Sequence, residues 1–182
     1  MKPNVIPVEV LDQLLIYHSA TGQFEWKRRS LNWFHGNRRL WRGWNTQFSG
    51  KPALIANLNG YKQGCILKTL VYAHRVAWAM HYGAWPEGEI DHINGDRSDN
   101  RILNLRDVPH RENQKNQKLP RHNTSRAVGV TWNKNANKWM AQIAVGGENR
   151  YLGIYSNIDD AIAARKDAEQ RFGFHQNHGR TM

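Results

Sequence analysis

Residues 89–108, EIDHINGDRSDNRILNLRDV, constrain the fold more than any other stretch of the chain. Two short apolar runs lie on either side of a mostly polar loop of Asp, Asn, Ser, Arg and Gly. Gly95 suits a left-handed turn in this loop, and the Asp and Asn side chains suit capping of exposed backbone. The segment that follows, residues 109–118, looks helical, with Pro109 in or near its first turn. This order predicts a strand, a loop, a second strand and a helix.

Polar side chains in these pieces are suited to hydrolysis of a phosphodiester bond. That reaction needs a metal ion to hold the phosphate, a base to activate water and a group that orients the base. Asp91 offers a hard oxygen to a divalent cation, and the imidazole of His92 can accept a proton from water. Asn104 can fix that imidazole, and Asn113 on the helix can complete the metal site. Asp91 and His92 alone also fit a polar hairpin turn, and only the whole set favours an active site.

Charge and cysteine content narrow the class of protein further. The 182 residues allow one ordinary domain or two small ones. A net charge of +11, from 26 Lys and Arg against 15 Asp and Glu, predicts a polyanionic partner, most often nucleic acid. No apolar run is long enough to cross a bilayer and the first residues do not resemble a leader, so we expect a cytoplasmic protein without a membrane partner. The single cysteine, Cys65, excludes a disulfide and a Cys-pair zinc site, so we expect no structural zinc.

Residues 1–50 form the first of several parts along the chain. Apolar side chains at a helical spacing predict a helix over residues 8–17, and residues 21–27, TGQFEWK, suit a turn and a short strand. Residues 28–50 mix Trp, Arg and Gly without a clear period, which predicts a surface loop or an insertion. This loop would either contact DNA or be a solvated basic loop. Its basic side chains include Arg28, Arg29, Arg38, Arg39 and Arg42.

Residues 51–118 form the second part. Two alternating runs around Asn59-Gly60 carry the strongest short signal for a hairpin. Residues 73–83 suit a short helix that ends at a glycine. The basic, Pro-broken stretch 119–127 is interpreted as a linker.

Residues 128–182 form the third part. Three strand-like runs, VGVTW, KWMAQIAV and RYLGIY, are separated by polar turns. A helix follows, with Ser156 as its predicted N-cap, two Asp residues near its positive end and Gly173 at its close. A three-stranded sheet with one helix on its back is the simplest packing.

The stretch HRVAWAMHYGAWPEGEIDHINGDRSDNRILNLRDVPHRENQKN resembles the HNH endonuclease family, in the form found in phage and intron homing endonucleases. The resemblance covers roughly residues 51–117, and its motifs are DHxxGxxxxN, NLR and ENxxN. The upstream pieces TGQFEWK and NGYKQG are also similar to these phage proteins. The family often has His-Arg where His74 and Arg75 stand. These two residues suit either a phosphate contact or a packed histidine beside a surface arginine.

The resemblance implies a ββα-metal module and a role for each site residue. Asp91 would be a metal ligand, His92 the general base and Asn104 the residue that orients His92. Asn113 would be the second metal ligand, at a position where other branches of the family carry a His. His110, one helical turn earlier, is the rival ligand. The ion would be Mg²⁺, with Mn²⁺ as the alternative.

A second resemblance concerns the third part. GVTWNKNANKWMAQIAVGGENRYLGIYSNIDDAIAARKDAEQRFG resembles the AP2 DNA-binding domain, which lays its sheet in the major groove. Alternation along the middle strand then predicts that Trp139, Ala141 and Ile143 face the helix. The opposite face would meet DNA, although a module of this kind could also simply cap the nuclease.

Together these features predict an α+β protein with a ββα-metal nuclease module, followed by a three-stranded antiparallel sheet with one helix. The expected parts are residues 1–50, the nuclease domain 51–118, the linker 119–127 and the AP2-like domain 128–182. The expected contacts to double-stranded DNA are Arg75, Arg101, Arg106, Arg111, Lys115, Lys118, Arg121, Arg126, Thr131, Lys134, Lys138, Met140, Gln142 and Tyr151.

The predicted function is that of a metal-dependent homing-type DNA endonuclease that nicks or cleaves double-stranded DNA. It would be phage-encoded and act in the bacterial cytoplasm, with a monomer favoured. The alternatives are a DNA-binding regulator that has lost cleavage, and a structure-specific nuclease in phage DNA repair or packaging.

Overall fold

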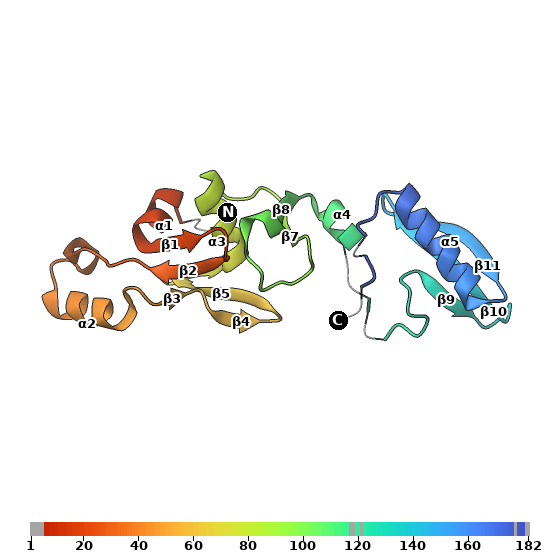
Figure 1. The fold of residues 1–182 in the computed structure, drawn as a ribbon, viewed down its shortest axis with the longest axis horizontal. Coiled ribbons are helices and arrows are strands. Elements are labelled where there is room, and N and C mark those ends of the chain that lie inside the picture. The colour runs from red at the N-terminus through yellow and green to blue at the C-terminus, as the bar shows by residue number, and fades with distance from the viewer. Residues whose placement is uncertain (1–5, 117–118, 121, 177, 181–182) are drawn as a thin grey trace. The chain divides into compact units, whose positions relative to one another are not determined.

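The computed structural model describes residues 6–116, 119–120, 122–176 and 178–180. The chain divides into two compact units, Met1–Asp107 and Val108–Met182. Both units combine small antiparallel sheets with helices, which confirms the mixed α+β class (Figure 1). None of the helices in these described ranges is long and apolar enough to cross a bilayer. The predicted DNA contacts Lys118, Arg121 and the side chain of Arg111 lie outside the described residues.

The first unit is built around one hydrophobic core. In chain order its elements are α1 (Val8–Leu14), β1 (Leu15–His18), β2 (Gln23–Trp26), the 3₁₀ helix η1 (Leu31–Phe34), α2 (Arg38–Phe48), β3 (Pro52–Ala53), β4 (Ala56–Leu58), β5 (Tyr61–Ile66), β6 (Thr69–Tyr72), α3 (Ala73–Tyr82), β7 (Glu89–His92), the 3₁₀ helix η2 (Ile102–Asn104) and β8 (Leu105–Val108). The strands form three sheets, β1-β2-β3, β4-β5-β6 and β7-β8. Leu11, Ile66 and Val76 are fully buried in the core, which also includes Ile90 of β7 and Leu105 of β8. The core thereby holds the two strands that carry the candidate site.

The predicted helix over residues 8–17 is confirmed only as far as Leu14. Leu15 has extended backbone angles, and β1 starts there because it pairs antiparallel with β2. Tyr17 lies opposite Phe24 in this pairing, and their rings stack 4.8 Å apart. Pairing between segments therefore outweighs the local helical spacing at this point.

The prediction of a loop over residues 28–50 is wrong, since this segment contains η1 and α2. The side chain of Asn37 caps α2 by accepting a hydrogen bond from the Leu40 amide at 3.1 Å. Trp41, Trp44 and Phe48 lie at helical spacing and are partly buried, whereas Arg and polar residues occupy the positions between them. This arrangement is an amphipathic helix whose apolar side consists of aromatic rings.

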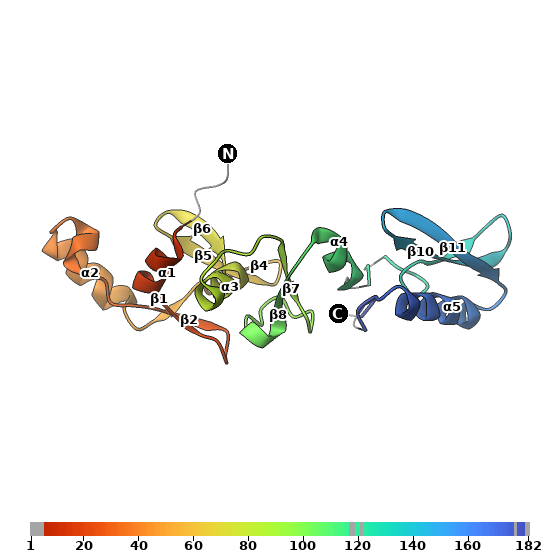
Figure 2. The ribbon, with the colours of Figure 1, turned by 90° about the horizontal axis from the view of Figure 1, so that it is seen from above.

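The hairpin predicted at Asn59-Gly60 is confirmed by the pairing of β4 with β5. Both turn residues have positive φ angles, 52° and 88°, as a two-residue hairpin turn of this sequence requires. The helix predicted after it is also confirmed, since α3 ends at Gly83 with a φ of 74°. Figures 1 and 2 show α3 inside the first unit, and it packs against α1, β5 and β6.

The second unit begins with a short helical segment and continues with a sheet. Its elements are α4 (His110–Asn113), the 3₁₀ helix η3 (Gln114–Asn116), β9 (Val130–Asn133), β10 (Lys138–Val145), β11 (Glu148–Tyr155) and α5 (Ile158–Arg171). The sheet order β11-β10-β9 and the helix that packs on it confirm the predicted three strands and one helix. Ala141 and Ile143 are buried, while Trp139 is partly buried against the same core.

Two details of the second unit correct the predictions. Asn157, and not Ser156, caps α5, because its side chain accepts a hydrogen bond from the Asp159 amide at 2.9 Å. The helix predicted over residues 109–118 is only one α-helical turn that continues as 3₁₀.

Candidate active site

β7 places Asp91 and His92 side by side in the protein interior. Their relative exposures are only 7% and 4%. Arg106 on the neighbouring strand β8 binds the Asp91 carboxylate, with Nε and Nη2 at 2.8 and 2.6 Å from Oδ2. Arg106 has this carboxylate partner within the protein, and the DNA contact predicted for it stays a prediction. Its guanidinium offsets the charge of a carboxylate that would be costly to bury alone.

His92 lies in a cluster of rings and is held near an amide. Its ring centroid is 5.2 Å from that of His74 and 5.9 Å from that of Tyr61. Its Nε2 is 3.4 Å from Oδ1 of Asn100. Burial lowers the pKa of His92 below its ordinary value, although Asn100 and nearby acidic residues act in the opposite direction. The imidazole is therefore neutral near pH 7 and can accept a proton.

His74 is a packed histidine. It is 7% exposed, and its ring stacks on Tyr72 with centroids 5.5 Å apart. Burial, together with the neighbouring His92 and Arg75, lowers the pKa of His74 to about 3. Arg75 uses its guanidinium within the protein, where it donates to the carbonyl oxygens of Gly88 and Pro86, both at 3.1 Å. The DNA contact predicted for Arg75 stays a prediction.

Asn104 shapes the loop that follows β7. Its Oδ1 accepts a hydrogen bond from the amide of Asn94, and its Nδ2 donates to the carbonyl of Asp99, both at 2.9 Å. The Asn104 carbonyl also accepts from the Ile93 amide at 2.9 Å. Asn104 thus holds both ends of the loop that begins directly after His92. A direct role of Asn104 in orienting the His92 imidazole stays a prediction.

Asn100 is the site residue that the sequence did not reveal. It is only 1% exposed, and its carbonyl accepts a 2.7 Å hydrogen bond from the hydroxyl of Tyr17, 83 positions earlier. Its loop is rich in Asp and Asn that suit capping, so composition does not distinguish Asn100 from its neighbours. Arg101, predicted to contact DNA, forms an exposed ion pair with Asp99 at 2.6 Å.

The remaining predicted residues lie in the second unit. His110 and Asn113 begin and end α4, so their roles as metal ligands stay predictions. Tyr151 is 63% exposed on β11. The other predicted DNA contacts described in this unit are Lys115, Arg126, Thr131, Lys134, Lys138, Met140 and Gln142.

The donors on β7 fit a divalent cation in kind. A carboxylate oxygen and an imidazole are ligands that such ions accept in proteins. Among the described residues, however, no group of three or more His, Cys, Asp or Glu could hold a metal ion. Arg106 already contributes a positive charge at Asp91, so a cation would share that carboxylate with the guanidinium.

β7 thus brings a buried histidine and a buried carboxylate next to each other in the sequence of a strongly basic protein, a combination that suits hydrolysis with a general base. Comparison with known proteins agrees with this class of reaction, because residues 71–115 match the family model of the HNH endonuclease. This segment begins at the end of β6 and includes α3, β7, the loop and β8. The match supports nuclease activity on DNA at the level of the family.

A curated protein is also similar to this chain. Protein 3.8 of Escherichia phage T7 is 34% identical over 76 residues, which are 41% of this chain and 63% of that protein. The matched segment thus spans less than two thirds of that relative. No solved structure matches the chain.

Proposed function

We propose that the protein is a metal-dependent DNA endonuclease of the homing type, with His92 as its general base. The observation that carries the proposal is the buried His92 next to Asp91 on β7, within the segment that matches the HNH family. Burial keeps the imidazole neutral, which is the form that accepts a proton from water. The similarity to a phage protein supports a phage origin.

Asn100 is proposed to hold the imidazole of His92 in place, because its Oδ1 lies 3.4 Å from Nε2 and an amide oxygen can accept a hydrogen bond from that nitrogen. Asn104 supports this arrangement indirectly, because it closes the loop that carries Asn100.

Asp91 is the proposed metal ligand, and Asn113, or its rival His110, is the second ligand that the family resemblance implies. When bound, Mg²⁺ or Mn²⁺ would polarise the scissile phosphate and stabilise negative charge on the leaving 3′ oxygen. The expected products carry 5′-phosphate and 3′-hydroxyl groups. Arg106, if it released Asp91, would supply hydrogen-bond donors that suit a phosphate oxygen.

The second unit is proposed to bind duplex DNA as an AP2-like module. Its sheet buries Ala141 and Ile143 toward α5, which leaves the alternate residues on the opposite face. Lys138 and Tyr151 are exposed there and suit contacts to the phosphate backbone and to base edges.

One observation favours the alternative of a DNA-binding regulator that does not cut. Arg106 pairs with Asp91, the carboxylate that a catalytic metal would need. The two functions differ in a single measurable property, cleavage that depends on His92 and on metal.

The test is to incubate supercoiled plasmid with the protein and Mg²⁺ or Mn²⁺, with EDTA controls. His92→Ala removes the proposed base, and His81→Ala removes an exposed histidine from α3 as a matched control. We expect relaxed circles from the unmodified protein and from His81→Ala, and none from His92→Ala or with EDTA. Equal cutting by His92→Ala would contradict the proposed base. Salt-sensitive binding without any cutting, on plasmid and on phage DNA, would support the regulator.

A further inference from the structure

The segment between β2 and β3, which contains η1 and α2, is a folded and strongly basic extension. Residues 27–51 contain seven Lys and Arg and no Asp or Glu. The helix is held against the segment that follows β2, because Nε1 of Trp41 and Nδ2 of Asn45 both donate to the Arg29 carbonyl, at 2.8 and 3.0 Å. Oδ1 of Asn45 also accepts from the Arg29 amide at 2.9 Å. These three bonds fix the positions of the side chains around them.

The arginines of this extension fall into two groups. Arg29 packs between rings, with its guanidinium carbon 3.8 Å from the ring centroid of Trp44 and 5.3 Å from that of Trp26. Burial lowers the pKa of Arg29, which is typical of a side chain that serves packing. Arg28 and Arg42 are exposed, and within the described part of the chain no hydrogen bond or ion pair engages either guanidinium. Their donors are available to a ligand.

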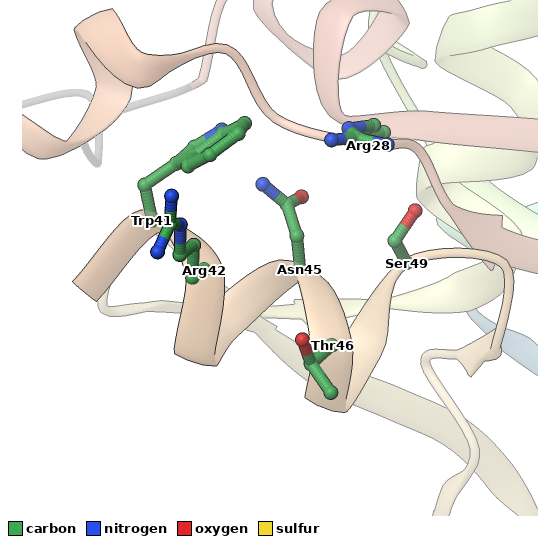
Figure 3. Close-up of a pocket in the computed structure, with 6 residues that line it drawn as sticks. All are labelled: Arg28, Trp41, Arg42, Asn45, Thr46 and Ser49. Carbon is green, nitrogen blue, oxygen red and sulfur yellow. The ribbon is translucent and has the colours of Figure 1, made fainter. Parts of the chain in front are cut away.

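A pocket of about 270 Å³ lies between these two arginines. It is lined by Arg28, Trp41, Arg42, Asn45, Thr46 and Ser49. Figure 3 shows Trp41, Arg42 and Asn45 on α2 and Ser49 at its C-terminal end, with Arg28 facing them from the preceding segment. Arg28 lies 5.4 Å from the ring centroid of Trp41, so a planar cation borders an aromatic ring at one side of the space.

We propose that this pocket binds a backbone phosphate of duplex DNA. Two guanidinium groups supply positive charge, and together with the hydroxyl groups of Thr46 and Ser49 they supply hydrogen-bond donors that suit phosphate oxygens. The ring of Trp41, which is partly buried and lines the pocket, would offer an apolar contact for the adjoining sugar. The segment has no acidic residues, so none of its own carboxylates competes with the phosphate.

The pocket is separate from the candidate active site. In both views, α2 lies at the opposite end of the first unit from β7 and β8 (Figures 1 and 2). The pocket therefore extends the surface of the first unit that contacts DNA, and does not contribute to the chemistry. The inference rests on the proposed function in one respect, because that function makes DNA the ligand. It does not depend on whether the protein cleaves DNA.

The test compares two double variants that remove the same charge. Arg28→Gln with Arg42→Gln removes the arginines of the pocket, and Arg38→Gln with Arg39→Gln removes two exposed arginines of α2 that do not line it. Binding to a fluorescent duplex is measured by anisotropy over a range of salt concentrations. All proteins carry His92→Ala and are kept in EDTA, so that the duplex stays intact.

We expect the pocket variant to bind about tenfold more weakly, and its slope of log affinity against log salt to fall by roughly 1. The control should lose less than about threefold, because it removes charge but no fixed contact. Arg28→Lys with Arg42→Lys should recover part of the loss, and thermal melting checks that each variant is folded.

Equal losses in the two double variants would overturn the proposal, because net charge would then explain them. A pocket variant that binds as well as its parent, or a parent that binds no duplex, would also overturn it. Failure of the proposed function has a different signature, namely absence of cutting by the unmodified protein. A protein that does not cut but needs Arg28 and Arg42 for binding would still support the pocket.

Discussion

Replacing His74 by leucine should remove a large part of the stability that the first unit loses as the pH falls. Burial first, and then His92 and Arg75, lower the pKa of His74 to about 3. An unfolded chain has an ordinary histidine with a pKa of about 6.5. The unfolded state therefore binds the proton first as the pH falls, and the folded state loses stability from about pH 6.5 down to about pH 3.

The size of the effect follows from these two values. In this window, each unit by which the pH falls lowers the free energy of unfolding by about 1.4 kcal/mol for a single histidine. Two units below the ordinary pKa, near pH 4.5, the unfavourable contribution of His74 is about 2–3 kcal/mol. That is a large share of the total stability of a small domain, which is roughly 5–15 kcal/mol.

Urea unfolding, followed by tryptophan fluorescence at about pH 8 and about pH 4.5, measures this contribution. The free energy of unfolding should fall by about 2 kcal/mol less in His74→Leu than in the unmodified protein over this range. Changes in packing cancel in the comparison because they do not depend on pH. His81→Leu, at an exposed position of the same helix, should keep the loss seen in the unmodified protein. If His74→Leu shows that same loss, His74 is not held neutral in the folded protein and the reasoning fails.

Three further predictions concern the site and the two cores. Gly22→Ala should destabilise the protein by more than about 2 kcal/mol and impair cutting, because a Cβ there would lie 2.5 Å from backbone atoms of the loop after β7. Gly83 has a similar φ, but an added Cβ there would meet open space, so Gly83→Ala should lower the stability by only about 1 kcal/mol. Equal losses of stability in thermal melts would refute the steric argument. Glu169→Gln should lower the free energy of unfolding by about 3 kcal/mol, because it leaves a buried arginine without its carboxylate. Asp167→Asn, in an exposed ion pair, should lower it by less than about 0.5 kcal/mol. Urea unfolding measures both values, and equal losses would contradict the role of burial. The rate of single-turnover cutting should stay constant as the pH falls to below about 6.5, because the lowered pKa of His92 keeps its imidazole neutral. A rate that halves near that pH would contradict this prediction.

Local signals in the sequence predicted the elements that depend only on neighbouring residues. The turn at Asn59-Gly60 and the end of α3 at Gly83 follow from the φ angles that these residues tolerate. The alternation along β10 correctly indicated which side chains face α5. The order of strand, loop and strand that carries Asp91 and His92 was also predictable, because apolar runs and loop residues occur in turn.

Segments with competing signals were predicted less well. The helical spacing of residues 8–17 continues past the true end of α1, because strand pairing with β2 decides where the helix stops. In α2, arginines between the aromatic residues hide the helical period from inspection of the sequence. In both segments, contacts with another element, and not the local pattern, decide the outcome.

The sequence by itself determined the residue types of the candidate site, its place between two short strands and the strongly basic character of the protein. The tertiary structure alone decided that Asn100 and His74 adjoin His92, that Arg106 pairs with Asp91 and that Arg28 and Arg42 border one pocket. The physical reason is that backbone preferences and side-chain periodicity act over a few residues, whereas burial brings together groups that are far apart along the chain. Burial also sets the protonation of His92, which no spacing of residues could have revealed.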